Sequence, residues 1–257
     1  MNTQENFCEV QAALQPKVVL ITGAARRLGA VIARLLHHHG MNVLLHYHQS
    51  ESEVKTLCSE LNSLRTDSAL ALQADLLQNK QLISLVHKAS KVWGHLDVLV
   101  HNASMFYATP VSSANEAAWD ELMGTNLKAA FFLAQAAAPH LAKRHGCIVN
   151  IADIHGLKPL REHPIYCAAK AGLIMLSKSL AIELAPEIRV NVVAPGSITW
   201  HGHEQELDAA LQAKIIKRTP LQRLGNAMES AQAVLFFIEQ ADYSTGQVLT
   251  VDGGRGI

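Results

Sequence analysis

The sequence predicts an α/β fold, a doubly wound parallel sheet of about seven strands flanked by helices. Short β-branched or leucine-rich runs alternate with longer helical patterns along the chain, which indicates repeated strand–helix units. Several of the short runs are apolar throughout, as expected for parallel strands that helices cover on both faces. The carboxyl ends of such strands meet at one edge of the sheet, where ligands bind.

The elements follow one another in regular order. Strands are predicted at residues 17–22, 42–46, 69–74, 98–101, 147–151, 189–193 and 247–251. Helices are predicted at residues 28–39, 52–65, 80–93, 116–145, 164–184 and 227–239. Pro139 is expected to bend or locally break the fourth helix, because proline removes a backbone donor and clashes with the preceding turn.

Composition and charge restrict what the protein can bind. The chain has 257 residues, of which 22 are basic and 22 acidic, so its formal net charge is zero. Binding to nucleic acid depends on an excess of Lys and Arg, so we expect no nucleic-acid partner. Hydrophobic residues make up 49% of the chain and charged residues 17%, which predicts a folded protein with a large core.

The length fits one domain, because α/β proteins often use about 250 residues for a single domain. No linker rich in Pro, Gly or Ser divides the chain. We expect residues 1–16 to form a flexible N-terminal extension and residues 17–257 to form a single catalytic domain. The insertion at residues 197–220 follows the sixth strand and is expected to cover the active edge as a lid.

The chain shows no sign of export, membrane insertion or metal binding. Residues 1–16 lack a basic and an apolar region, and no apolar run reaches the roughly 18–20 residues of a membrane span. The four cysteines have no metal-ligand spacing and suit a reduced cytoplasm. His201 and His203 lie in a predicted loop without further ligands, so no metal site is expected.

A glycine-containing turn follows the first strand and opens a helix. The turn reads TGAARRLG from Thr22 to Gly29. Gly23 would allow the tight turn, Gly29 would allow close contact between helix and strand, and the helix N-terminus would offer N–H groups to a pyrophosphate. The spacing is neither GxGxxG nor a Walker A loop, so by itself it is also compatible with an ordinary strand–helix turn.

The end of the second strand indicates which dinucleotide binds. An NAD site usually carries an acidic residue there for the ribose 2′-hydroxyl. This chain has no acid at that point, and its polar residues favour a 2′-phosphate and therefore NADP(H). These residues are His46, Tyr47, His48, Gln49 and Ser50. The alternative for His46 is an inward-facing core histidine.

Tyr166 and Lys170 are four residues apart on a predicted helix, so they share one face. A lysine ammonium would stabilise the phenolate and lower the pKa of Tyr166 from its usual value of about 10, which would make it a proton donor near neutral pH. A tyrosine and a lysine at this spacing are common by chance. The pair becomes evidence for a catalytic site only together with the motifs after the first, fourth and sixth strands.

Together these motifs resemble the short-chain dehydrogenase/reductase family over residues 17–254. The motifs are TGAARRLG, Ala74-Asp75, HNAS at 101–104, Asn126, YCAAK at 166–170, Pro195-Gly196 and TGQVLTVDGG. Three departures are similar to the pteridine reductase branch, which includes the dihydromonapterin reductases. Arg27 replaces the middle glycine of the turn, Ser104 replaces the last glycine of NNAG with Phe106 two residues later, and Asp153 replaces the usual catalytic serine. Gln49 stands where relatives usually carry Arg, which leaves the preference for NADPH less strict.

The resemblance implies a Rossmann-type fold, bound NADPH and a role for each matching residue. The implied cofactor-binding residues are Gly23, Arg27, Leu28, Gly29, His46, Tyr47, His48, Gln49, Ser50, Asp75, Leu76, Asn102, Ala103, Ser104, Tyr166, Lys170, Pro195, Gly196 and Ser197. The implied catalytic residues are Asp153, Tyr166, Lys170 and Asn126, with Asn126 positioning Lys170 through backbone and water. The implied pterin-binding residues are Arg27, Ser104, Phe106, Asp153 and Tyr166. The family also commonly forms homotetramers.

The leading hypothesis is an NADPH-dependent reductase of dihydropterins, with dihydrofolate as a further substrate. Phe106 would stack on the pterin, although a single aromatic residue is by default a core residue. Asp153 would repel the oxyanion of a carbonyl substrate, whereas reduction of a C=N bond develops no oxyanion. The alternatives are a carbonyl reductase acting on a ketone and a non-catalytic NADP-binding regulator, against which the intact Tyr166–Lys170 pair argues.

Overall fold

The computed structural model describes residues 15–199 and 208–257. Within them, seven strands form one sheet in the order β3-β2-β1-β4-β5-β6-β9, and every neighbouring pair is parallel. The strands are β1 Val18–Ile21, β2 Asn42–Tyr47, β3 Ala69–Gln73, β4 Val98–His101, β5 Cys147–Ile151, β6 Arg189–Pro195 and β9 Val248–Val251. The predicted α/β fold with a doubly wound parallel sheet is therefore confirmed.

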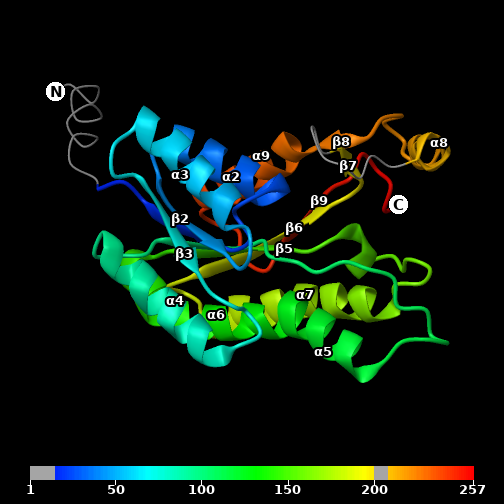
Figure 1. Cartoon of the computed structure of the whole chain (residues 1–257), viewed down its shortest axis with the longest axis horizontal. Coiled ribbons are helices and arrows are strands. Elements are labelled where there is room, and N and C mark those ends of the chain that lie inside the picture. Colours follow the sequence, from blue (N-terminus) through cyan, green and yellow to red (C-terminus); the bar gives the residue numbers. More distant parts are fainter. Residues whose placement is uncertain (1–14, 200–207) are drawn as a thin grey trace.

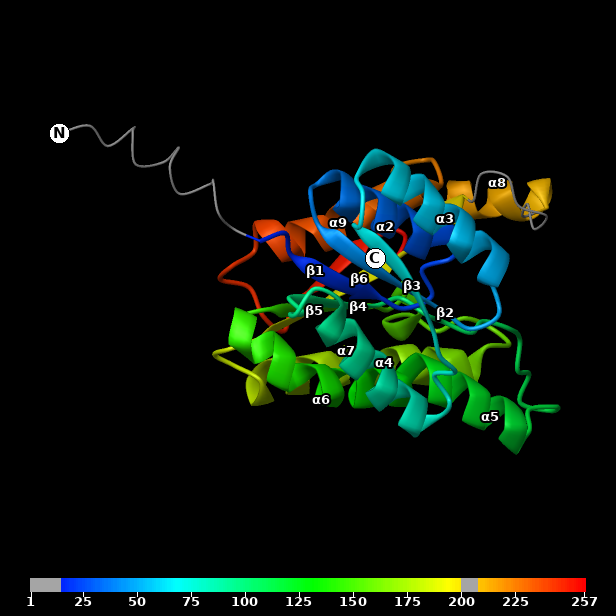
Figure 2. The ribbon, with the colours of Figure 1, turned by 60° about the vertical axis from the view of Figure 1, so that its left-hand side comes forward.

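Helices cover both faces of the sheet (Figures 1 and 2). One face carries α2 Arg27–His38, α3 Glu51–Leu64 and α9 Ala227–Glu239. The other face carries α4 Asn79–Val92, α5 Glu116–Met123, α6 Ala129–Leu141 and α7 Pro164–Glu183. Because both faces are covered, the central strands β1, β4 and β5 are buried at every position.

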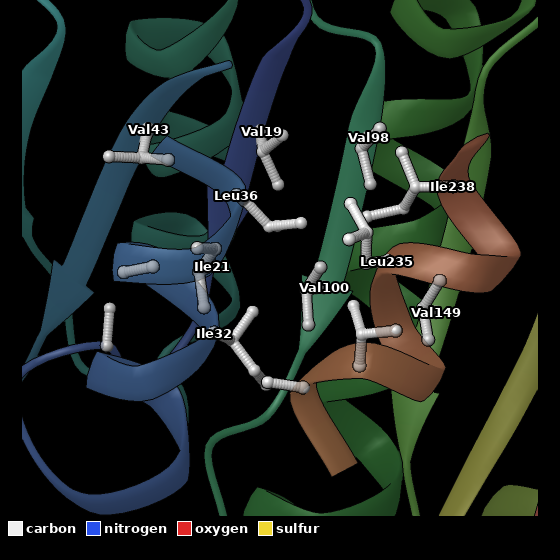
Figure 3. Packing of buried hydrophobic residues seen from close by; sticks show 14 of the residues in the cluster. Val19, Ile21, Ile32, Leu36, Val43, Val98, Val100, Val149, Leu235 and Ile238 are labelled. Carbon is white, nitrogen blue, oxygen red and sulfur yellow. The ribbon is translucent and has the colours of Figure 1, made fainter. Parts of the chain in front are cut away.

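The core beneath α2 and α9 is made of aliphatic side chains from strands and helices (Figure 3). The fully buried members include Val19, Ile21, Ile32, Leu36, Val43, Val98, Val100, Val149, Leu235 and Ile238. Truncation of one such leucine to alanine typically costs about 2–5 kcal/mol of stability. This rigid layer fixes the strand ends at which the site is built.

The predicted break at Pro139 is wrong. Pro139 lies inside α6, and the helix continues to Leu141. The departure from α geometry lies one element earlier, where Gly124–Lys128 forms a π-helical turn between α5 and α6. The side-chain amide of Asn126 donates to the Leu122 carbonyl oxygen at 2.9 Å and so satisfies an acceptor in the distorted ladder. Turns of this kind are frequent at functional sites.

The strand order changes direction between β1 and β4. These two strands are neighbours in the sheet, but β2 and β3 separate them in sequence and lie on the far side of β1. The connections that follow β1 and β4 therefore leave in opposite directions. In doubly wound sheets this is where ligands bind.

The segment predicted as a lid lies partly outside the described residues. After Ser197, the short strand β7 Ile198–Thr199 pairs with β8 Gly225–Asn226, and α8 Ala209–Lys217 lies between them in the chain. His201 and His203 belong to residues 200–207 and residues 1–14 form most of the expected extension, and both segments lie outside the described residues.

Helix α7 is apolar and 20 residues long, so by length and composition alone it could cross a membrane. Half of its most apolar window is buried inside the fold. The helix packs against α5 and β6 and carries the buried Lys170. It is therefore placed as a core helix in this structure.

Candidate active site

The predicted site residues converge on the carboxyl edge of the sheet. Gly23 follows β1, Asn102 follows β4, Asp153 follows β5 and Gly196 follows β6. The parallel order of these strands brings residues that are far apart in sequence to one edge.

Gly23 and Gly29 form a turn with no room for side chains. Gly23 has a φ of +63°, and a Cβ there would lie 2.9 Å from the Cα of Ala103. A Cβ on Gly29 would overlap the Gly23 carbonyl oxygen. Both positions therefore require glycine, for conformation at Gly23 and for close approach at both.

Thr22 and Asn102 tie this turn to the end of β4. Thr22 Oγ1 accepts the backbone N–H groups of Asn102 and Ala103, both at 3.0 Å. In return, Asn102 Nδ2 donates to the carbonyl oxygens of Thr22 at 2.9 Å and Gly23 at 3.0 Å. The predicted cofactor residues Asn102 and Ala103 thus hold the glycine turn in place.

Arg27 adopts a backbone conformation that normally belongs to glycine. Its φ is +52°, in the left-handed region, and it stands where the usual motif has its middle glycine. The conformation costs a non-glycine residue on the order of 1 kcal/mol. Arg27 is exposed at the start of α2, next to the buried Leu28, so its guanidinium is free to meet a phosphate.

His46 faces inward and does not form part of a cationic phosphate site. Its Nδ1 accepts the Gly23 N–H at 3.1 Å, and its Nε2 lies 3.0 Å from the Ala74 carbonyl oxygen. Burial lowers the pKa of His46 to about 4, so the ring is neutral at pH 7. The prediction that His46 is one of the polar residues that meet the 2′-phosphate is therefore corrected, and the inward-facing alternative describes this residue.

The rest of the second strand end is open to solvent. His48 and Gln49 are exposed, while Tyr47 and Ser50 are half-buried. On the neighbouring strand, Asp75 Oδ1 accepts the Leu77 N–H at 2.9 Å, and the predicted Leu76 is buried.

Tyr166 and Lys170 point to the same region from α7. The Tyr166 hydroxyl donates to Asp153 Oδ2 at 2.8 Å. The Lys170 ammonium donates to the Ile151 carbonyl oxygen at 2.9 Å and lies 5.7 Å from the centroid of the Tyr166 ring. Asp153 Oδ1 accepts the His155 N–H at 2.8 Å, so the carboxylate both caps the following turn and orients the tyrosine.

The electrostatics of this group differ from the sequence prediction. Burial, followed by the Asp153 carboxylate, holds the pKa of Tyr166 well above its usual range. Burial also lowers the pKa of Lys170 to about 8, against the opposing effect of Asp153. The expected lowering of the Tyr166 pKa by Lys170 is therefore corrected. Tyr166 is a neutral phenol whose proton is directed to Asp153.

Asn126 supports the substrate side of the site and makes no hydrogen bond to Lys170 within residues 15–199 and 208–257. Its Oδ1 accepts the Ser104 hydroxyl at 2.7 Å, and its Nδ2 donates to the Met105 carbonyl oxygen at 3.0 Å. Ser104 also acts on the Tyr166 hydroxyl and partly offsets the rise of the Tyr166 pKa. Asn126 thus fixes the loop that carries Ser104 and Phe106.

Phe106 is not a core residue. Its side chain is 56% exposed, and its ring stacks on His163 with centroids 4.7 Å apart and planes at 12°. It also meets the Tyr166 ring edge-on at 4.8 Å. An exposed aromatic ring next to Tyr166, the predicted catalytic tyrosine, is suited to a flat ligand.

Three contacts of the loop that carries Phe106 were missed in the sequence. His163 lies three residues before Tyr166 and so shares its side of the helix start, which could have been noticed. Tyr107 donates to Glu121 Oε2 at 2.7 Å, and burial with this bond raises the pKa of Tyr107 to about 12. Glu162 accepts the Thr109 N–H at 2.6 Å. These contacts tie the Phe106 loop to α5 and to the segment before α7.

The edge beyond β6 is closed by the C-terminal segment. Gly196 donates to the Val251 carbonyl oxygen at 3.0 Å, and a Cβ on Gly196 would lie 2.7 Å from the Cβ of Asp252. Ser197 Oγ accepts from the Arg255 guanidinium. No motif in the sequence indicated Arg255.

A family model described as enoyl-(acyl carrier protein) reductase matches residues 23–255. The chain belongs to the short-chain dehydrogenase/reductase family. Members of this family are oxidoreductases that use NAD(P)H, and the predicted family resemblance is confirmed.

Similar proteins carry two different activities in their names. Pteridine reductase 1 of Leishmania tarentolae is 36% identical over 93% of this chain and 96% of its own length. The 3-oxoacyl-[acyl-carrier-protein] reductase FabG of Staphylococcus aureus strain Mu50 is 35% identical over 93% of this chain and 97% of its own length. FabG of Chlamydia muridarum is 34% identical over 95% and 99%. The identities are too close to choose a substrate.

The site of this short-chain dehydrogenase/reductase fits a nicotinamide dinucleotide. The glycine turn lets a ligand approach the backbone closely, and its packing against Ala103 excludes any larger residue at Gly23. No side chain caps the N-terminus of α2, so its first N–H groups are available to a pyrophosphate. Among the residues that the structure describes, no group of three or more metal-ligating side chains is found.

Proposed function

We propose that the protein is an NADPH-dependent pteridine reductase that converts dihydropterins to tetrahydropterins, with dihydrofolate as a further substrate. The observation that carries this proposal is the 2.8 Å hydrogen bond from the Tyr166 hydroxyl to Asp153 Oδ2. A carboxylate stands beside the tyrosine at the place where the family usually has a neutral serine.

The carboxylate favours a substrate that receives its proton on nitrogen. Reduction of a ketone builds negative charge on oxygen, and a carboxylate in the low dielectric of the site would destabilise that charge. Reduction of a C=N bond places a hydride on carbon and a proton on the neighbouring nitrogen, so no oxyanion forms. Asp153 can take a proton from solvent and pass it on with Tyr166, which acts as a general acid.

The exposed Phe106 supports a flat heterocyclic substrate. The Phe106 ring meets the Tyr166 ring edge-on and stacks on His163, and Phe106 remains 56% exposed to solvent. A pterin inserted at Phe106 would gain stacking and apolar contact that a short aliphatic ketone could not provide. Ser104, held by Asn126, would then offer its hydroxyl to the polar edge of the ring.

The cofactor would supply the hydride when bound. Gly23, Leu28, Gly29, Asn102, Ala103, Asp75 and Leu76 would form the dinucleotide cradle, with Pro195, Gly196 and Ser197 at the nicotinamide end. Tyr166 and Lys170 would bind the nicotinamide ribose. Arg27, His48, Gln49 and Ser50 would meet the phosphates, and the absence of a carboxylate among His46–Ser50 supports NADPH over NADH.

A ketone reductase is the second candidate, because the FabG relatives are nearly as similar as the pteridine reductase. NADPH oxidation should be followed with dihydrobiopterin, dihydromonapterin, dihydrofolate and a panel of ketones that includes acetoacetyl-coenzyme A. We expect turnover of the pterins. Turnover of ketones alone would overturn the proposal, and activity left unchanged by Tyr166→Phe would favour a non-catalytic role for the pair.

A further inference from the structure

The C-terminal segment folds back onto the catalytic edge of the sheet. After β9, both carboxylate oxygens of Asp252 hold the chain, with Oδ1 accepting the Gly254 N–H at 2.9 Å and Oδ2 accepting the Gly256 N–H at 2.6 Å. A Cβ on Gly256 would lie 3.9 Å from Cγ2 of Ile154, the residue after Asp153. Arg255 lies between Gly254 and Gly256, so this turn brings Arg255 close to the segment that carries Asp153.

Arg255 is half-buried beside the site. Its Nη1 donates to Ser197 Oγ, directly after the Pro195-Gly196 motif. Burial lowers the pKa of Arg255, and the Asp153 carboxylate opposes this effect. The bond to Ser197, which follows Gly196 after β6, places the guanidinium at the carboxyl edge of the sheet.

The nearby carboxylates are already occupied by other donors. Asp153 accepts from His155 and Tyr166, one donor for each oxygen. Asp252 accepts from Gly254 and Gly256 in the same way. A guanidinium has five N–H donors, and only the bond to Ser197 engages those of Arg255 within residues 15–199 and 208–257.

The charge of a second guanidinium acts on Arg255. Arg218, at the end of α8, is exposed, and its charge contributes to lowering the pKa of Arg255. Neither arginine forms an ion pair within 4.0 Å in the described part of the chain. In the described part of the chain both guanidinium groups keep N–H donors that no carboxylate engages within 4.0 Å, and such donors suit an anion.

We propose that Arg255, assisted by Arg218, binds a carboxylate that the substrate carries beyond its reacting ring. This proposal rests on the proposed function and narrows it. A dihydropterin whose side chain ends in carboxylates, as in dihydrofolate, would be preferred over dihydropterins with uncharged side chains. A planar guanidinium suits this role because it can bond both oxygens of a carboxylate.

The test compares charged and uncharged substrates in matched variants. KM and kcat are measured with NADPH for dihydrofolate and for dihydrobiopterin. The variants are Arg255→Gln, which removes the charge, and Arg255→Lys, which keeps the charge but loses the planar fork. Lys217→Gln is the control, because Lys217 is an exposed cation next to Arg218 with no part in the site.

We expect Arg255→Gln to raise KM for dihydrofolate by about ten-fold or more, the usual range for a lost charge-assisted hydrogen bond. KM for dihydrobiopterin should change by less than about two-fold, and Arg255→Lys should recover part of the loss. An equal loss for both substrates, or the same loss in Lys217→Gln, would overturn the proposal.

A binding experiment separates this inference from the reaction itself. The NADP⁺-loaded protein is titrated calorimetrically with p-aminobenzoyl-L-glutamate, which has the carboxylates of dihydrofolate but no pterin. Binding that is lost in Arg255→Gln supports the anion site even if no pterin is reduced. If the wild-type protein did not bind p-aminobenzoyl-L-glutamate, the proposed anion site at Arg255 would be wrong. The proposal that the protein reduces pterins would not be affected.

Discussion

The Tyr166 hydroxyl donates to Asp153 Oδ2 at 2.8 Å, while the other oxygen of Asp153 accepts the backbone N–H of His155. Each oxygen of the Asp153 carboxylate therefore accepts one hydrogen bond, and these bonds fix its orientation. Because Asp153 and burial raise the pKa of Tyr166, the tyrosine keeps its proton until a substrate or Asp153 takes part in the transfer. The proposed preference for C=N substrates rests on this relationship.

Asp153→Ser should lower kcat for dihydropterins by about 100-fold, the lower end of what general acid–base catalysis contributes. Serine keeps a hydroxyl near Tyr166 but cannot carry a proton as a carboxyl group does. Asp153→Asn is the matched control, because it keeps an oxygen acceptor for the His155 N–H while removing the charge. Steady-state kinetics with saturating NADPH would measure both, and an unchanged kcat in Asp153→Ser would refute the proton relay.

Phe106→Ala should weaken pterin binding by about ten-fold and leave kcat less affected, because stacking contributes about 0.5–1.5 kcal/mol beyond the buried area. The thermal midpoint of unfolding should change little, since the ring is exposed. Phe106→Tyr keeps the aromatic face and should bind nearly normally. An unaltered pterin Kd in the alanine variant would show that Phe106 does not stack on the pterin.

His46 should make folding sensitive to acid. Its pKa is about 4 in the folded protein and about 6.5 when unfolded, so the unfolded state binds more protons between these values. Stability is therefore lost as the pH falls through this window, by about 2 kcal/mol from this residue between pH 7 and pH 5.

Urea titrations at several pH values would measure this effect. His46→Gln should flatten the pH dependence, because glutamine can replace the hydrogen bonds to Gly23 and Ala74 but does not titrate. His87→Gln, on the exposed side of α4, is the control and should leave the slope unchanged. If the stability of His46→Gln fell equally steeply with pH, other titratable groups would be the cause of the acid sensitivity.

Arg27→Gly should separate stability from cofactor binding. Glycine relieves the left-handed conformation at φ +52°, so the free energy of unfolding should stay within about 1 kcal/mol of the wild-type value, on the stable side. NADPH should bind about ten-fold more weakly, because a charge-assisted phosphate contact is lost. Fluorescence titration of NADPH would measure this, with Arg27→Lys as the variant that keeps the charge. Tight NADPH binding in Arg27→Gly would exclude a phosphate contact.

The fold could be predicted from the sequence because apolar runs and helical patterns report burial on each element separately. The π-helical turn at Gly124–Lys128 could not, because no residue pattern in the sequence marks it. Pro139 was misinterpreted as well. The surrounding contacts allow the helix to continue through a residue that favours a break on its own.

The grouping of Tyr166, Lys170 and Asp153 could be predicted because the spacing of the motifs can be read in one sequence. Their charges could not, since the pKa of Tyr166 depends on how deeply α7 is buried and on which way Asp153 points. Likewise, the residues around His46 are polar and predict an exposed strand end, but His46 itself is buried among core residues. Arg255 lies more than 80 residues from Tyr166 in sequence, and only the fold brings its segment beside Asp153.

The most direct test of the central claim is a competition assay. The wild-type protein is given NADPH with equal concentrations of dihydrobiopterin and acetoacetyl-coenzyme A, and both products are quantified by chromatography. Tetrahydrobiopterin should form at least about 100 times faster than the hydroxyacyl product, because Asp153 opposes an oxyanion beside Tyr166. Preferential reduction of the ketone would contradict the assignment of this site to pterins.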